Sequence, residues 1–164
     1  MKHRYLITRI VALLIIAVGI FLDQMTKFLA VTHLKGSNPF VLIDGVFQFA
    51  YQENPGAAFG ILSNDRWVFL VISTIAIIAI LFYVFYKKNM PTLWIVSLSL
   101  IVSGGIGNMI DRLALGYVVD FLDFCLINFA VFNVADSFVT VGAGLMIFAL
   151  VREMVLEFKK AKNK

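Results

Sequence analysis

The stretch from Trp67 to Tyr86 contains no charged side chain and is long enough to cross a membrane as a helix, which takes about 20 apolar residues. Three further stretches, about 7–31, 93–111 and 132–153, approach this length and composition. The whole chain is only 15% charged, whereas a soluble domain carries roughly 25%. The sequence therefore predicts an all-α integral membrane protein with four transmembrane helices, built as one membrane-embedded domain over residues 1–164.

Basic side chains gather in three places: the amino-terminal end, the short loop between the second and third stretches, and the carboxyl-terminal tail. They are Lys2, Arg4, Arg9, Lys87, Lys88, Arg152, Lys159, Lys160, Lys162 and Lys164. A basic tail is also typical of nucleic-acid binding, but the positive-inside rule accounts for all three clusters at once. We therefore expect no nucleic-acid partner, both termini in the cytoplasm, and two outer loops of about 32–66 and 112–131.

The first outer loop has a regular pattern. Two apolar runs, 40–43 and 46–51, flank Asp44-Gly45, a dipeptide favoured in tight turns because it tolerates positive φ. The pattern predicts an extracytoplasmic β-hairpin. Because the hairpin is too apolar to be merely solvated, we expect it at the membrane interface, where it could cover an apolar substrate.

Two aspartates stand out at the outer ends of the predicted helices. Asp120 lies in the second outer loop, and Asp136 lies at the start of the fourth stretch. Ionisable groups at membrane depth are costly and usually face a cavity or a partner. Two carboxylates within hydrogen-bond range share a proton, so that one can take a proton from water while the other donates to a scissile carbonyl oxygen. The pair is typical of a water-activating dyad. A helix amino-terminus would explain Asp136 alone, but not the neighbouring polar residues.

Those neighbours follow helical spacing. Asn108, Asp111 and Arg112 stand at i, i+3 and i+4, so they can point inward together, and Asn133 precedes Asp136 by three residues. The planar fork of Arg112 could hold carboxylates. For Asp111, a salt-bridge cluster at the helix end and a role in the site are equally well supported.

Two further motifs precede the second helix. Asp23 and Lys27 are four residues apart, and a structural ion pair explains them better than a catalytic role. The loop 54–60, with sequence Asn-Pro-Gly-Ala-Ala-Phe-Gly, has small residues that allow close backbone approach, and Asn54 can hydrogen-bond an extended peptide. An ordinary turn would look the same.

Several other chemistries find little support. Cys125 is the single cysteine, so no internal disulfide can form. With only His3 and His33, neither an HExxH-type zinc site nor a histidine-based triad is expected. Ser103 has no evident general base. The residues therefore give no support to a disulfide, a histidine-based zinc site or serine catalysis.

Taken together, these segments closely resemble the lipoprotein signal peptidase family, also called signal peptidase II or prolipoprotein signal peptidase. Five polar blocks carry the resemblance, and their order and spacing are together highly specific. The blocks are Asp23 with Lys27, 54–60, 107–112, 118–121 and 132–136. The match covers nearly the whole chain.

The resemblance implies roles for individual residues. Asp120 and Asp136 match the family's catalytic aspartyl dyad. The substrate-binding and pocket-shaping positions are matched by Asn54, Gly56, Asn108, Arg112 and Asn133. The supporting positions are matched by Asp23, Lys27, Ala57 and Asp111.

The resemblance also implies the reaction. Family members are aspartic-type endopeptidases of the bacterial cell membrane. They remove the signal peptide of a prolipoprotein just before a diacylglyceryl-modified cysteine, use no metal or organic cofactor, and are inhibited by the cyclic peptide globomycin. We expect an active site near the outer face, in contact with membrane lipid, and a monomer, because one chain can supply the whole site.

Two other classes of protein could use the same polar residues. A small ion-coupled carrier also buries Asp, Asn and Arg, but four crossings leave little room for alternating access and no inverted repeat is evident. A non-catalytic assembly subunit could use the cluster to hold its helices together. Replacing Asp120 by Asn distinguishes an enzyme from a structural subunit. An enzyme would lose turnover and keep its fold, whereas a structural cluster would lose stability. Asp123, which could be mistaken for the catalytic residue, is predicted to be dispensable.

Overall fold

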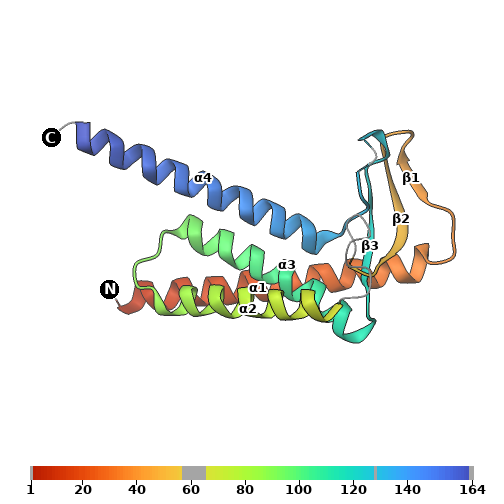
Figure 1. Ribbon diagram of the computed structural model, residues 1–164, viewed down its shortest axis with the longest axis horizontal. Coiled ribbons are helices and arrows are strands. Elements are labelled where there is room, and N and C mark those ends of the chain that lie inside the picture. Colours follow the sequence, from red (N-terminus) through yellow and green to blue (C-terminus); the bar gives the residue numbers. More distant parts are fainter. Residues whose placement is uncertain (1, 57–65, 128, 163–164) are drawn as a thin grey trace.

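The computed structural model describes residues 2–56, 66–127 and 129–162. It contains four long helices and a small antiparallel sheet (Figure 1). In chain order the elements are α1 (Lys2–Leu34), β1 (Phe40–Ile43), β2 (Phe47–Asn54), α2 (Arg66–Tyr86), α3 (Thr92–Ala114), β3 (Val118–Asp123), the 3₁₀ helix η2 (Cys125–Ile127) and α4 (Val134–Lys162).

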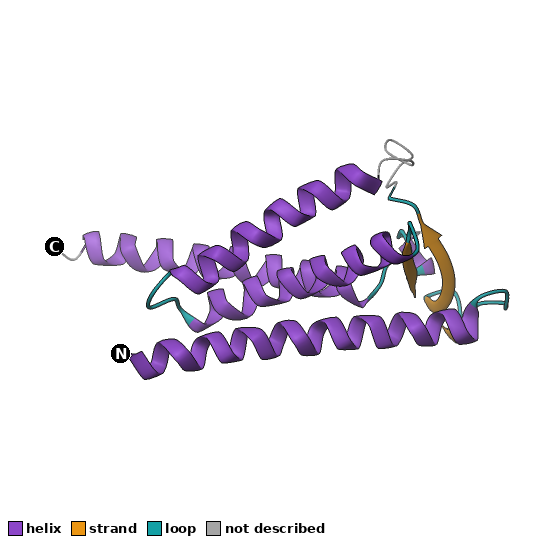
Figure 2. Ribbon diagram, turned by 90° about the horizontal axis from the view of Figure 1, so that it is seen from below, coloured by secondary structure: helices purple, strands orange, loops and turns teal. Residues whose placement is uncertain are grey.

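The helices run along the long axis of the molecule, and the sheet lies across one end of them (Figures 1 and 2). Both termini lie at the opposite end, as does the connection between α2 and α3 (Figure 1). The basic clusters, as far as the structure describes them, therefore lie toward the end of the bundle that is remote from the sheet. This is the arrangement that the four-crossing topology requires.

All four helices are long and apolar enough to cross a membrane: Tyr5–Leu34, Trp67–Tyr86, Thr92–Ala114 and Val134–Lys162. Their outward surfaces are apolar; Phe28 on α1 and Phe82 on α2, for example, are each 67% exposed. Such side chains are stable when lipid tails rather than water surround them. The chain is thus a multi-pass membrane protein, and the predicted all-α membrane fold with an accessory hairpin is confirmed.

All four helices are longer than the sequence predicted, and α1 and α4 exceed their predicted lengths the most. The first continues to Leu34 beyond the predicted end at residue 31. The fourth begins at Val134 rather than 132 and continues to Lys162 rather than 153. No glycine or proline interrupts residues 152–162, so nothing in the sequence stops the helix where the apolar stretch ends.

Small residues allow close approach between the helices that carry the polar side chains. A Cβ atom at Gly104 of α3 would collide with the backbone carbonyl of Ala135 on α4, and one at Gly107 would collide with the Asp23 carboxylate of α1. The glycines of α3 therefore permit α1, α3 and α4 to meet around Asp23.

The predicted hairpin is present. β1 and β2 pair antiparallel with Ile43 opposite Phe47, and Gly45 in the turn has φ 65°. The second outer loop, 112–131, contains structure that the sequence did not predict, because β3 lies within it and pairs with β2. The hydrogen bonds that make Val118–Asp123 a strand come from β2, which is distant in sequence.

Candidate active site

Asp120 lies on β3 and is only 1% exposed. Each of its carboxylate oxygens accepts a hydrogen bond from an amide side chain: Oδ1 from Asn133 Nδ2 at 2.6 Å, and Oδ2 from Asn54 Nδ2 at 2.9 Å. Side chains alternate along a strand, so Val119 and Phe121 point to the other face, where they pack against Ala30 of α1. The strand thus separates a polar face that carries Asp120 from an apolar face that anchors the sheet.

Asp136 lies in the first turn of α4, and its position is set by a reciprocal cap. The backbone N–H of Asp136 donates to Asn133 Oδ1 at 2.9 Å, and the backbone N–H of Asn133 donates to Asp136 Oδ2 at 3.2 Å. This is a capping box in which asparagine and aspartate replace the usual residues. The other oxygen, Oδ1, accepts a hydrogen bond from Asn108 Nδ2 at 2.8 Å. Asp136 is therefore both a helix-capping residue and a member of the polar cluster.

Asn133 connects the two aspartates. Its Oδ1 caps α4 next to Asp136, while its Nδ2 donates to Asp120 and to Asn108 Oδ1. Burial is the largest influence on Asp120 and raises its pKa to about 6; the hydrogen bond from Asn54 opposes this, and the charge of Asp136 adds to it. The carboxylate of Asp136 is thus close enough to Asp120 to raise the pKa of Asp120.

A buried ionic cluster lies next to this network. Lys27 Nζ is 3.0 Å from Asp23 Oδ2 and 3.0 Å from Asp111 Oδ2. The expected pairing of Asp23 with Lys27 is therefore present. Asp23 also accepts the backbone N–H of Ala135 at the start of α4, and Asp111 accepts that of Val119 on β3. The cluster joins α1, α3, β3 and α4, so both acidic residues have structural contacts that explain their burial.

The remaining polar residues line the site from other directions. Arg112 stacks on Phe69, with 5.2 Å from its guanidinium carbon to the ring centroid. Within the part of the chain that the structure describes, it forms no ion pair with a carboxylate, so the fork-like grip considered above is not seen. Its Nε is buried without a hydrogen-bond partner there. Gly56 has φ 107°, and a Cβ there would lie 2.9 Å from the Phe69 ring. Ala57 lies outside the described residues.

Comparison with known proteins gives a consistent result. The model of the family described as "Signal peptidase (SPase) II" matches residues 15–152. The chain belongs to the signal peptidase II family. The lipoprotein signal peptidase of Streptococcus thermophilus is 47% identical over 133 residues, covering 80% of this chain and 86% of the relative. That of Clostridium tetani is 41% identical over 151 residues, covering 90% and 97%.

Solved structures of bacterial membrane enzymes share the fold of this chain. A bacterial membrane enzyme determined by the in meso method at 2.3 Å resolution is 34% identical, with a TM-score of 0.78 over 88% of this chain and 89% of that one. A second, at 1.9 Å, gives a TM-score of 0.77 at the same identity. Membership of this family implies that the chain is a protease.

Some contacts in this signal peptidase II chain were not anticipated from the sequence. Gln24 Nε2 donates to Asp111 Oδ1 at 3.0 Å and to Asp23 Oδ2 at 3.1 Å, which places it within the ionic cluster. A polar glutamine inside an otherwise apolar stretch was the sequence signal that could have indicated this role for Gln24. Asp123 accepts a hydrogen bond from Gln48 at 2.7 Å and makes no contact with the dyad network within the residues that the structure covers.

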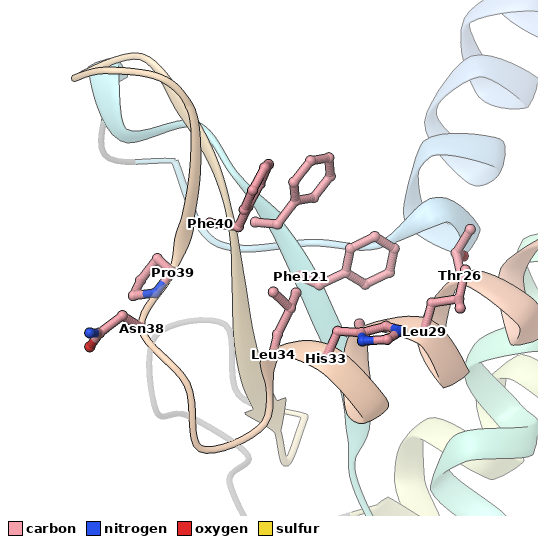
Figure 3. Close-up of a pocket in the computed structure, with 10 residues that line it drawn as sticks. Thr26, Leu29, His33, Leu34, Asn38, Pro39, Phe40 and Phe121 are labelled. Atoms are coloured by element: carbon pink, nitrogen blue, oxygen red, sulfur yellow. The ribbon is translucent and has the colours of Figure 1, made fainter.

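The signal peptidase II chain also has an apolar pocket of about 480 Å³ between the end of α1 and the hairpin (Figure 3). Its walls include Leu29, Leu34, Phe40 and Phe121. Phe121 points away from the face of β3 that bears Asp120. The pocket is therefore separate from the polar cluster, and none of the predicted site residues lines it. No group of three or more metal-binding side chains occurs in residues 2–56, 66–127 and 129–162.

Proposed function

We propose that this chain is an aspartic-type endopeptidase that removes the signal peptide of bacterial prolipoproteins, cleaving just before a diacylglyceryl-modified cysteine. One observation carries the proposal: Asp120 from β3 and Asp136 from α4 are held in a single network of amide side chains. Family membership supports the substrate class, because the curated relatives are lipoprotein signal peptidases.

The two aspartates would have different tasks. Asp120 is the more buried, and with its pKa raised to about 6 it is the better candidate to hold the shared proton. Asp136, ionised, takes a proton from water, and the resulting hydroxide attacks the scissile carbonyl carbon. Asp120 donates its proton to the carbonyl oxygen. Collapse of the tetrahedral intermediate breaks the C–N bond, the leaving amine receives a proton from the dyad, and no covalent enzyme intermediate forms.

Arg112 and Gly56 would contact the substrate. The guanidinium of Arg112 has an unpaired buried N–H, which makes it a candidate donor to a substrate carbonyl oxygen. Asn54 is held at both ends of its amide, because its Nδ2 donates to Asp120 and its Oδ1 accepts the N–H of Gly56. Its role would be to hold Asp120 rather than to bind substrate directly, as would be the roles of Asn108 and Asn133.

The location of the site suits a lipid-bearing substrate. The dyad lies where β3 and the start of α4 meet, at the sheet end of the four apolar helices (Figure 1). The basic clusters at the other end favour cytoplasmic termini. The dyad would therefore face the outer side of the bacterial cell membrane, where the scissile bond and acyl chains would arrive. We further propose that the enzyme acts as a monomer and is inhibited by globomycin.

A cleavage assay tests the proposal. Purified wild type and Asp136→Asn would be given a synthetic lipobox peptide that carries a diacylglyceryl-cysteine, in detergent, with and without globomycin. We expect globomycin-sensitive cleavage by the wild type and none by the variant. A folded wild type that does not cleave would refute the proposed activity, and cleavage by a folded Asp136→Asn would refute the dyad.

A further inference from the structure

Three asparagine side chains present their N–H groups to the dyad. Asn54 and Asn133 donate to Asp120, and Asn108 donates to Asp136 at 2.8 Å. An asparagine amide has a donor end and an acceptor end. Turned the other way, each would place an oxygen against a carboxylate. The orientation of each amide therefore decides whether it stabilises or repels the aspartate it touches.

In each of the three, a group that can only donate holds the amide oxygen. The backbone N–H of Gly56 donates to Asn54 Oδ1, and the backbone N–H of Asp136 donates to Asn133 Oδ1, both at 2.9 Å. For Asn108 two donors hold Oδ1: the ammonium of Lys27 at 2.9 Å and Asn133 Nδ2 at 3.1 Å. An ammonium has three donors and no acceptor, and Lys27 makes the shorter, charge-assisted contact. Backbone groups thus set two of the orientations, and two side chains, Lys27 foremost, set the third.

The surroundings of Lys27 hold its ammonium in place. Its side chain is 4% exposed, and its partners besides Asn108 are Asp23 and Asp111, each at 3.0 Å. These three contacts use all three of its N–H donors. A buried cation needs paired charges, so the two carboxylates account for its presence. They do not account for the third donor, which points at the amide that contacts Asp136.

We propose that Lys27 is a positioning residue for the dyad, which orients the Asn108 side chain so that Nδ2 donates to Asp136. The inference rests on the proposed function and extends it to a residue of α1 that does not touch either aspartate of the dyad. If Lys27 only balanced buried charge, its loss could be compensated by removing one of the two neighbouring carboxylates. If Lys27 orients Asn108, restoring the charge balance would not restore activity.

The ionic cluster offers a variant that makes this distinction. Asp23, Lys27 and Asp111 together carry one positive and two negative charges, a net charge of −1. Lys27→Met alone leaves two buried carboxylates unpaired and endangers folding. Lys27→Met combined with Asp111→Asn keeps the net charge at −1, and the new amide retains an oxygen for the N–H of Val119. Lys27→Gln with Asp111→Asn is a second variant that keeps a polar group at the same place.

The first measurement is the kinetics of lipopeptide cleavage in detergent. For Lys27→Met with Asp111→Asn we expect kcat to fall about tenfold or more, a change of about 1.4 kcal/mol in the activation barrier. The change in KM should be much smaller. Lys27→Arg keeps a donor-only cation and should retain more activity. The matched control is Lys35→Met with Glu53→Gln, which removes an ion pair whose side chains are 51% and 43% exposed. Wild-type kcat in a folded double variant would overturn the proposal.

A second measurement does not depend on cleavage. In protein labelled with ¹⁵N-asparagine, the side-chain amide signal of Asn108 can be identified by its loss in Asn108→Leu. We expect this signal to move as the dyad titrates in the wild type, and to stop following the titration in Lys27→Met with Asp111→Asn. The Lys27→Gln double variant keeps an N–H donor and should retain more of the response. An unchanged response in the folded Lys27→Met double variant would refute the orienting role. If the wild type fails to cleave, the proposed activity is refuted, while the amide signal still decides the orientation.

Discussion

The burial of Asp120 predicts a specific dependence of stability on pH. Its pKa is raised from an ordinary value of 3.8 to about 6, chiefly because its carboxylate is desolvated. One pKa unit corresponds to about 1.4 kcal/mol, so the ionised side chain costs the folded protein about 3 kcal/mol relative to the unfolded chain. A raised pKa means that the folded state holds the proton more tightly. The stability from this residue is therefore fully present in acid and is lost as the pH rises from about 4 to above about 6.

Asp120→Asn removes this titration. The amide of the variant does not titrate, whereas the cost of the ionised carboxylate in the wild type grows as Asp120 loses its proton. We expect the free energy of unfolding of the variant, minus that of the wild type, to increase by about 2 kcal/mol between pH 4 and pH 7, most of the full difference of about 3 kcal/mol. Thermal unfolding of both proteins in detergent, over this pH range, measures the difference.

Asp136→Asn is the internal control for this experiment. The charge of Asp136 contributes to the raised pKa of Asp120, but burial contributes more. The variant should therefore keep most of the pH-dependent loss of stability that the wild type shows. A difference between Asp120→Asn and wild type that does not change with pH would refute the argument from burial.

The remaining predictions concern activity and use the lipopeptide assay. Asp120→Asn should abolish cleavage while the protein stays folded, and cleavage near the wild-type rate would contradict the dyad. Asp123→Asn should keep appreciable activity; its complete inactivation beside an active Asp120→Asn would mean that the wrong aspartate was chosen in β3. Asn54→Leu removes a hydrogen bond that lowers the pKa of Asp120, so the pH at which activity declines on the alkaline side should rise, and an unchanged profile would contradict that role. EDTA should not affect cleavage, because the proposed water activation uses carboxylates; loss of activity that zinc restores would count against it.

Much of the fold follows from local sequence. Trp67–Tyr86 has no charged side chain, so as a helix it is most stable inside a membrane. The three basic clusters agree with one topology for the four helices, in which both termini lie on the same side of the membrane. Asp44-Gly45 between apolar runs is sufficient for a hairpin, because turn geometry is decided within a few residues. Polar residues at helical spacing likewise identified the candidate site, because buried polar groups in such a chain require partners.

The partners themselves could not be read from the sequence. Val118–Asp123 is a strand only because β2 lies beside it, and Asp111 has its place because Lys27 and the backbone of β3 meet it from distant parts of the chain. The sequence placed Asn54, Asn108 and Asn133 near the dyad, but an amide can face either way. For Asn54 and Asn133 the deciding donor is a backbone N–H two or three residues along the chain, whereas for Asn108 the tertiary structure brings Lys27 from α1 and Asn133 from the residue before α4. Residue type determined what chemistry was possible, and the packing of the helices and sheet decided which partners the Asn108 amide meets.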